Sequence, residues 1–239
     1  MKKAILSLSG GLDSTCLLLF LLDKGYEVRT YSFNYGQKHI IELESAKRNI
    51  QYLIKKGLPV SHQIIDLKDC FSDSRSSLHS QSLEQIPEGH YEEESMKSTV
   101  VENRNIIFAS IIYGKALSWA KECNEPVEIH LGIHSGDHQI YPDTTPQSRL
   151  AAELCFKISN WDSEKVSYKA PFENFDKSEV LLCGRSSSFC LDFEEILRNT
   201  HTCYSPDSEG RSCGKCGSCV ERLEAFGKLH IVDPVEYAK

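Results

Sequence analysis

The sequence has no apolar run of the length that crosses a membrane. A spanning helix needs about 20 consecutive, mainly apolar residues, whereas the apolar run near the start extends only from Ala4 to Leu8 and is interrupted by Ser7. That run is also too short for the apolar part of a signal peptide, and a buried first strand explains it better. We therefore expect a cytoplasmic protein without membrane association.

An excess of positive charge is also missing. The formal net charge is −7 and the pI is about 5.7, whereas proteins that coat nucleic acids present basic faces. Stable nucleic-acid binding is therefore not expected, although a local basic patch is compatible with this composition. The 239 residues, of which 40% are hydrophobic, fit one large globular domain, or one domain with a small appendage.

Two common nucleotide-binding loops, G-x-x-x-x-G-K-[ST] and G-x-G-x-x-G, are absent. In their place, residues 7–14 read Ser-Leu-Ser-Gly-Gly-Leu-Asp-Ser between a predicted strand and a predicted helix, where a doubly wound sheet binds its ligand. Glycines let the backbone approach a ligand, free N–H groups at a helix start attract an anion, and Asp13 could hold a Mg²⁺ ion carried by a nucleotide. A tight turn capped by serine is the alternative. The loop predicts a phosphate site made by Ser7, Leu8, Ser9, Gly10, Gly11, Asp13 and Ser14.

The order of the elements predicts an α/β fold with a parallel sheet. Strands are predicted at 3–9, 27–34, 60–67, 127–133 and 166–170, and helices at 14–24, 42–56, 105–122, 147–158, 177–183 and 194–199. Strands that alternate with helices form right-handed β-α-β units. Residues 68–98 lack a clear period and are predicted to form a long loop, with a functional lid as one interpretation. We predict a first domain over 1–185 and a helical extension over 186–239.

The chain has ten cysteines, and four of them cluster near its end. Cys203, Cys213, Cys216 and Cys219 have the spacing C-x₉-C-x₂-C-x₂-C. Four thiolates bind tetrahedral zinc, and filling all four positions leaves none for a reacting water, so the spacing predicts a structural zinc site. A redox C-x₂-C pair and an iron–sulfur cluster are the alternatives. A disulfide framework is disfavoured because no secretory signal is predicted.

The glycine loop resembles the S-G-G-x-D-S signature of the PP-loop ATP pyrophosphatases. That resemblance implies a Rossmann-like adenine nucleotide α-hydrolase fold. It also implies cleavage of ATP between its α- and β-phosphates, so that an oxygen of the substrate takes up AMP.

Further motifs resemble the 7-cyano-7-deazaguanine synthases of the queuosine pathway, nearly end to end. Residues 33–39 read Phe-Asn-Tyr-Gly-Gln-Lys-His, similar to the family's F-x-Y-G-Q-[RK]-H. The other matches are Arg104-Asn105 with the end of V-P-G-R-N, Gly132 and Asp137 with G-x-x-x-x-D, Tyr141 to Asp143 with the start of Y-P-D-C-R, Asp176-Lys177 with a D-K pair, and the cysteine region.

The resemblance implies that a carboxylate on 7-carboxy-7-deazaguanine is adenylated and that ammonia then displaces AMP, with ATP, Mg²⁺ and a structural Zn²⁺ as cofactors and a homodimer as the assembly. The candidate catalytic residues are Asp13, Ser14, Lys38, Arg104 and Lys177, and the candidate substrate-binding residues are Phe33, Tyr35, Gln37, His39, Arg104, Asn105, Gly132, Asp137, Tyr141 and Asp143. Taken singly, lysines are more often solvated and strand aromatics more often belong to the core. His39 is interpreted equally well as a base or as a packed polar residue.

The acceptor side departs from the family pattern. Glu102-Asn103 stands where the family has P-G, and Thr144-Thr145 stands where it has C-R. The departure motivates a second hypothesis, a QueC-like paralogue of the antiphage CBASS type, which would join the activated deazaguanine to a protein amine. A catalytically silent binding module and a tRNA-thiolating PP-loop enzyme are further alternatives. The intact Asp13 and Ser14 disfavour the former, and the acidic pI disfavours the latter.

Overall fold

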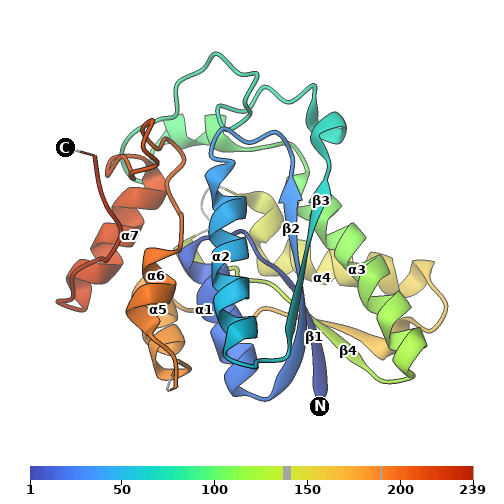
Figure 1. Ribbon diagram of the computed structural model, residues 1–239. Coiled ribbons are helices and arrows are strands. Elements are labelled where there is room, and N and C mark those ends of the chain that lie inside the picture. Colours follow the sequence, from blue (N-terminus) through green and yellow to red (C-terminus); the bar gives the residue numbers. More distant parts are fainter. Residues whose placement is uncertain (137–140, 189, 239) are drawn as a thin grey trace.

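Five parallel strands form the centre of the molecule, in the order β3-β2-β1-β4-β5 (Figure 1). The structure is a computed structural model, and it describes residues 1–136, 141–188 and 190–238. The strands are β1 (Lys2–Ser7), β2 (Tyr26–Asn34), β3 (Val60–Asp66), β4 (Val127–His130) and β5 (Val166–Lys169). The described helices are α1 (Leu12–Asp23), α2 (Ile41–Lys55), α3 (Arg104–Cys123), α4 (Pro146–Ser159), α5 (Lys177–Ser186), α6 (Phe193–Arg198) and α7 (Gly217–Lys228), with 3-10 turns η1 (Lys68–Phe71), η2 (Glu94–Thr99), η4 (Pro142–Thr144) and η5 (Ser163–Lys165).

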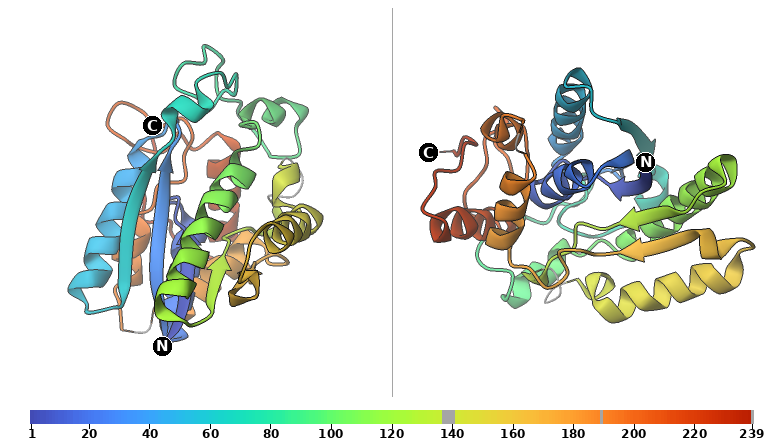
Figure 2. Two further views of the ribbon diagram at one scale, coloured as in Figure 1. Left: turned by 90° about the vertical axis from the view of Figure 1, so that its right-hand side faces the viewer. Right: turned by 90° about the horizontal axis from the view of Figure 1, so that it is seen from below.

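Both faces of the sheet are covered, as the consecutive buried apolar residues Ala4, Ile5 and Leu6 of β1 require. Successive side chains of a strand point to opposite faces. Ala4 and Leu6 accordingly join a core cluster with α1, α2 and the C-terminal helices, whereas Ile5, between them, joins a second cluster with α3. The left view of Figure 2 shows α2 and α3 on opposite sides of the strands. The predicted α/β class with a parallel sheet is confirmed.

Local signals explain where several elements begin. Asp176 caps α5 by accepting a hydrogen bond from the backbone N–H of Glu179, and the Glu179 side chain accepts one from the N–H of Asp176, which is a reciprocal capping box. Thr145 caps α4 in front of Pro146. Most predicted ends differ from the observed ones by one or two residues. The largest differences are three residues: the fourth strand ends at His130 rather than at residue 133, and α5 ends at Ser186 rather than at residue 183. Leu131 leaves the strand and starts the loop that reaches the glycine loop.

The segment 68–98 and the tail after α6 pack against each other. Apart from η1 and the start of η2, the segment has no regular element. Gly89 donates its N–H to the carbonyl of Lys215, and Glu88 forms an isolated bridge with Cys216. Phe226 on α7 lies in the same core cluster as α1. The predicted boundary between residues 185 and 186 stays a prediction. None of the described helices has both the length and the apolar character that a membrane crossing requires.

Candidate active site

The glycine loop lies at the point where the strand order reverses. β1 pairs with β2 on one side and with β4 on the other. The chain then continues from β1 into α1 through residues 8–11. Ligands of doubly wound sheets bind in the crevice that opens at such a point. The loop after β4 lies close by, because a Cβ on Gly132 would stand 3.2 Å from the Cα of Ser14.

Short contacts fix the shape of the glycine loop. Ser14 Oγ accepts a hydrogen bond from the N–H of Ser9 at 3.2 Å and lies 3.0 Å from Ser9 Oγ, which in turn accepts one from the N–H of Gly11 at 3.2 Å. Gly10 has φ +89°, and a Cβ there would lie 2.1 Å from the carbonyl oxygen of Glu42. Only glycine fits this position, because any side chain would meet the backbone of α2.

A cavity of about 260 Å³ opens beside this loop. Most of the predicted site residues line it, namely Ser7, Leu8, Ser9, Gly11, Asp13, Ser14, Phe33, Tyr35, His39, Arg104, Asn105, Gly132, Tyr141, Asp143 and Lys177. Gly10, Gln37 and Lys38 are not among its lining residues. Asp137 lies outside the described residues.

The side chains of Asp13 and Lys177, which both line the cavity, contact each other. The Lys177 ammonium, on a side chain only 5% exposed, lies 3.3 Å from Asp13 Oδ2 and donates a 2.6 Å hydrogen bond to Glu221 Oε2 on α7. The His134 ring lies 3.8 Å from Asp13 and 3.7 Å from Glu221. Burial opposes the ionisation of Asp13, but the positive charge of Lys177 is the largest of the effects that oppose burial, and the pKa of that carboxyl is lowered. Asp13 is therefore a carboxylate at neutral pH.

Arg104 is a further cation in the cavity lining. Arg104, at the start of α3, donates a hydrogen bond to the Tyr35 hydroxyl at 3.2 Å, and its guanidinium carbon lies 5.3 Å from the centre of the Tyr35 ring. Asn105 donates to Asp143 from its backbone at 3.2 Å and from its side-chain amide at 3.0 Å. Asp143 thereby holds the start of α3, and with it Arg104, against the cavity.

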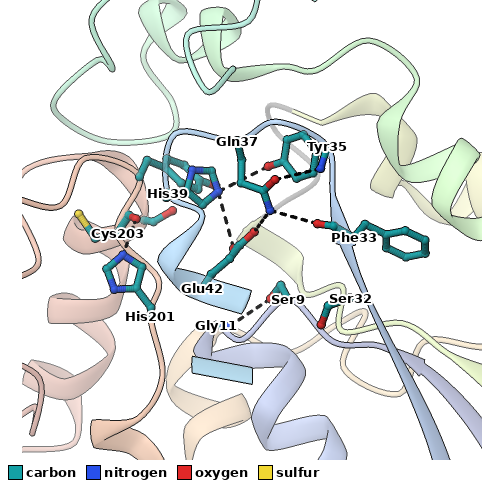
Figure 3. A network of polar contacts seen from close by, with 12 residues as sticks. Ser9, Gly11, Ser32, Phe33, Tyr35, Gln37, His39, Glu42, His201 and Cys203 are labelled. Atoms are coloured by element: carbon teal, nitrogen blue, oxygen red, sulfur yellow. Dashed lines mark hydrogen bonds and ion pairs between the residues drawn. The ribbon is translucent and has the colours of Figure 1, made fainter. Parts of the chain in front are cut away.

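Gln37 and Lys38, which do not line the cavity, form hydrogen bonds elsewhere. The Gln37 amide accepts from the N–H of Tyr35 and donates to the carbonyl of Phe33 and to Glu42, so it holds the turn after β2 in place (Figure 3). Lys38 donates to the carbonyl of Glu84 in the segment 68–98. Burial lowers the pKa of His39 to about 3, so its ring is neutral at neutral pH.

Several residues around the site were not predicted as site residues. The cavity lining includes Glu42, Tyr91, Arg149, His201, Thr202 and Tyr204. Outside the lining, Glu221 and His134 contact Asp13 or Lys177. His201 donates its N–H to the carbonyl of Gly10. The tail after α6 thus reaches the glycine loop, and in this tail only the cysteine region, at 202–204 and 213–219, carried a sequence signal.

The four cysteines of the tail converge. The sulfur atoms of Cys203, Cys213, Cys216 and Cys219 all lie within 4.8 Å of one another. Backbone N–H groups of Ser205 and Cys213 donate to Cys203 Sγ at 3.3 and 3.2 Å. N–H groups directed at sulfur stabilise thiolates and orient them for a metal. The donor set therefore fits a metal ion.

Comparison with known proteins gives a consistent result. A family model described as "Queuosine biosynthesis protein QueC" matches residues 3–230. The 7-cyano-7-deazaguanine synthases of Marinomonas sp. (strain MWYL1) and Hahella chejuensis (strain KCTC 2396) are 41% and 42% identical to this chain, each over 99% of it and over 98% and 93% of their own lengths. Among solved structures, a 4-thiouridine synthetase–RNA complex with bound ATP is similar at 16% identity with a TM-score of 0.47, over 96% of this chain and 51% of that one.

Proposed function

Because the chain belongs to the QueC family, we propose that it acts as a 7-cyano-7-deazaguanine synthase, an ATP-dependent ligase that forms carbon–nitrogen bonds. The observation that carries this proposal is the similarity to synthases of this activity over 99% of the chain. The cavity beside the glycine loop supports it, because its lining combines backbone N–H groups suited to phosphates with three acidic and three cationic side chains.

The proposed reaction activates oxygen twice. ATP transfers AMP to the carboxylate of 7-carboxy-7-deazaguanine, and ammonia displaces AMP to give the amide. The amide oxygen then takes up AMP from a second ATP, and loss of AMP leaves the nitrile. Each transfer turns a poor leaving oxygen into a good one, so the protein mainly positions the reactants and stabilises charge.

The geometry suggests a division of labour among the predicted residues. The N–H groups and hydroxyls of Ser9, Gly11 and Ser14 would bind the pyrophosphate part of ATP. A bound Mg²⁺ would supply further neutralisation of the phosphates, and Asp13, which is ionised, would hold it. Lys177 and Arg104, which both line the cavity, would stabilise the charge on phosphate or carboxylate oxygens.

The test of the function is a turnover assay. Purified protein is incubated with 7-carboxy-7-deazaguanine, Mg-ATP and ammonia, and the products are identified by mass spectrometry. We expect the nitrile, with AMP and pyrophosphate. Absence of ATP cleavage with this acid would overturn the proposal.

One observation favours a second candidate, in which the amide bond is the end point and a protein amine is the acceptor. Thr144 lines the cavity, and Thr145 Oγ1 caps α4 by accepting from the N–H of Ser148 at 3.3 Å. Neither threonine offers the thiol or the guanidinium of the C-R pair in the family pattern described above. Formation of nitrile from the free acid, ATP and ammonia would contradict this candidate.

Asp13→Ala is expected to lower the rate of pyrophosphate release at least tenfold, corresponding to about 1.4 kcal/mol or more in transition-state free energy. The reason is the loss of the proposed Mg²⁺ ligand, while Lys177 keeps its hydrogen bond to Glu221 and the site stays folded. The matched control is Asp23→Ala at the exposed end of the same helix. An unchanged rate for Asp13→Ala would remove Asp13 from the catalytic site.

We propose zinc as the metal of the four-cysteine cluster. Four thiolates with two x₂ spacings form a closed tetrahedral site, and we expect about one zinc per chain by metal analysis. Cys219→Ser should lower the zinc content and the resistance of the tail to proteolysis, because the four cysteines join residue 203 to the segment 213–219 of the tail. Cys155→Ser, at an exposed cysteine on α4, is the control. Iron in place of zinc, with visible absorption, would indicate a cluster instead.

A further inference from the structure

A buried carboxylate in the cavity wall has no part in the roles assigned above. Glu42, in the first turn of α2, lines the cavity, and its side chain is 12% exposed. Its backbone carbonyl is the group against which Gly10 packs. Glu42 therefore lies directly beside the loop that is proposed to bind ATP.

Glu42 differs in its contacts from the other two acids that line the described part of the cavity. Asp13 has the Lys177 ammonium at 3.3 Å, and Asp143 accepts two hydrogen bonds from Asn105. Glu42 Oε1 accepts from the Gln37 amide at 2.8 Å, and Oε2 lies 3.7 Å from His39 Nε2 (Figure 3). Gln37 orients the carboxyl group without neutralising it.

The surroundings of Glu42 set its proton affinity. Burial raises the pKa of Glu42 to about 7, and the hydrogen bond from Gln37 and the charge of Arg104 on α3 only partly oppose this effect. Because burial and the charges of Arg104 and His201 lower the pKa of His39 to about 3, the adjacent ring is neutral near neutral pH. Tyr35, directly after β2, is also neutral there because burial raises the pKa of its hydroxyl. A base that exchanges a proton near the working pH is the most effective kind.

We propose that Glu42 is the base that takes up the proton released when nitrogen attacks the activated substrate. This inference rests on the proposed function and adds a residue to it. Ammonia forms a bond to the acyl carbon of the adenylate, the bond from that carbon to the AMP oxygen breaks with its electron pair going to AMP, and the nitrogen gives one proton to the Glu42 carboxylate. The products are the amide, AMP and a protonated Glu42, which returns its proton to solvent as the products leave.

The experiment separates adenylation from nitrogen attack. Isotope exchange between pyrophosphate and ATP, with the acid and without ammonia, reports adenylation. Amide formation with ammonia reports both steps. For Glu42→Gln, which keeps the acceptor for Gln37 and the side-chain volume, we expect exchange near the wild-type rate and amide formation slowed about 100-fold, the lower end of what a positioned base contributes.

The pH profile provides a readout that a purely structural role would leave unchanged. At a fixed concentration of free ammonia, wild-type amide formation should rise as the pH passes through about 7, where Glu42 loses its proton. This rise should be absent from Glu42→Gln. The matched control is Glu44→Gln, two residues along α2 and exposed, which should behave as the wild type does.

The possible outcomes distinguish failure of the proposed function from failure of the role proposed for Glu42. Absence of exchange in the wild-type protein would overturn the proposed function and this inference with it. Normal wild-type exchange together with normal amide formation by Glu42→Gln would overturn the inference alone. An equal loss of exchange and amide formation in Glu42→Gln would also overturn it, because Glu42 would then act in ATP binding or folding.

Discussion

Replacing Lys177 by methionine is expected to slow pyrophosphate release about 100- to 1000-fold, the range seen when one preorganised donor to a developing charge is removed. The Lys177 ammonium is buried between Asp13 and Glu221. Without it, the proposed phosphate site loses a cation, and two carboxylates remain near each other in a poorly solvated place. The second effect raises the pKa of Asp13 and weakens its proposed hold on Mg²⁺.

The measurement is a single-turnover assay of pyrophosphate release, with thermal unfolding recorded in parallel. Lys228→Met is the matched control, because this lysine is 62% exposed and pairs with Asp176 at the surface. Glu221→Gln should have a smaller effect than Lys177→Met, since it changes the position of the ammonium but keeps its charge. Wild-type turnover by a folded Lys177→Met would refute the role proposed for this side chain.

The difference between Lys177 and Lys38 shows what the sequence can and cannot predict about this site. Both lysines lie in motifs that resemble the family's, and both were expected to stabilise charge. Lys177 lines the cavity at the start of a capped helix, whereas Lys38 donates to a carbonyl of the segment 68–98. A motif determines which residues are neighbours along the chain, but the direction of a long side chain depends on partners far away in sequence.

The glycine loop was predictable because its signal is local. A strand, two glycines and a helix start are adjacent in the sequence, and their order alone places the loop at an edge of the sheet. Glu221 and His134 had no such signal, since their importance comes from contacts with Asp13 and Lys177 on other elements. The helix α7 was not delimited for a related reason, because its first turn contains Gly217 and Cys219, and the latter belongs to the candidate metal site.

The tail borders the candidate active site and also carries a candidate metal site. Thr202 and Tyr204, on either side of Cys203, line the cavity, and Glu221 follows Cys219 by two residues. A metal that fixes the cysteines would therefore also fix the Glu221 carboxylate that holds Lys177. The predicted zinc site would thus support the proposed chemistry by fixing residues that are close to the cysteines in the sequence. No residue would need to bind both the metal and the substrate.

The strongest non-metal support of the tail is the buried pair of Arg222 and Asp233. Arg222 Nε donates to Asp233 Oδ2 at 2.6 Å and Arg222 Nη2 to Oδ1 at 2.9 Å, and their side chains are 1% and 4% exposed. Arg222 Nη1 also donates to the hydroxyls of Thr200 and Thr202. The guanidinium thus connects α7 to residues 200–202, in the part of the tail that borders the cavity.

Asp233→Ala is expected to lower the free energy of unfolding by about 3–5 kcal/mol, because it leaves the Arg222 charge buried without its partner. The measurement is equilibrium unfolding in urea, with Asp66→Ala as the control, since the exposed ion pair of Asp66 with Lys68 contributes at most about 1 kcal/mol. Adding Arg222→Met to Asp233→Ala should recover part of the loss, because the unpaired charge is then removed as well. A single variant as stable as the control, or a double variant less stable than the single one, would show that the cost of an unpaired Arg222 does not determine the stability of the tail.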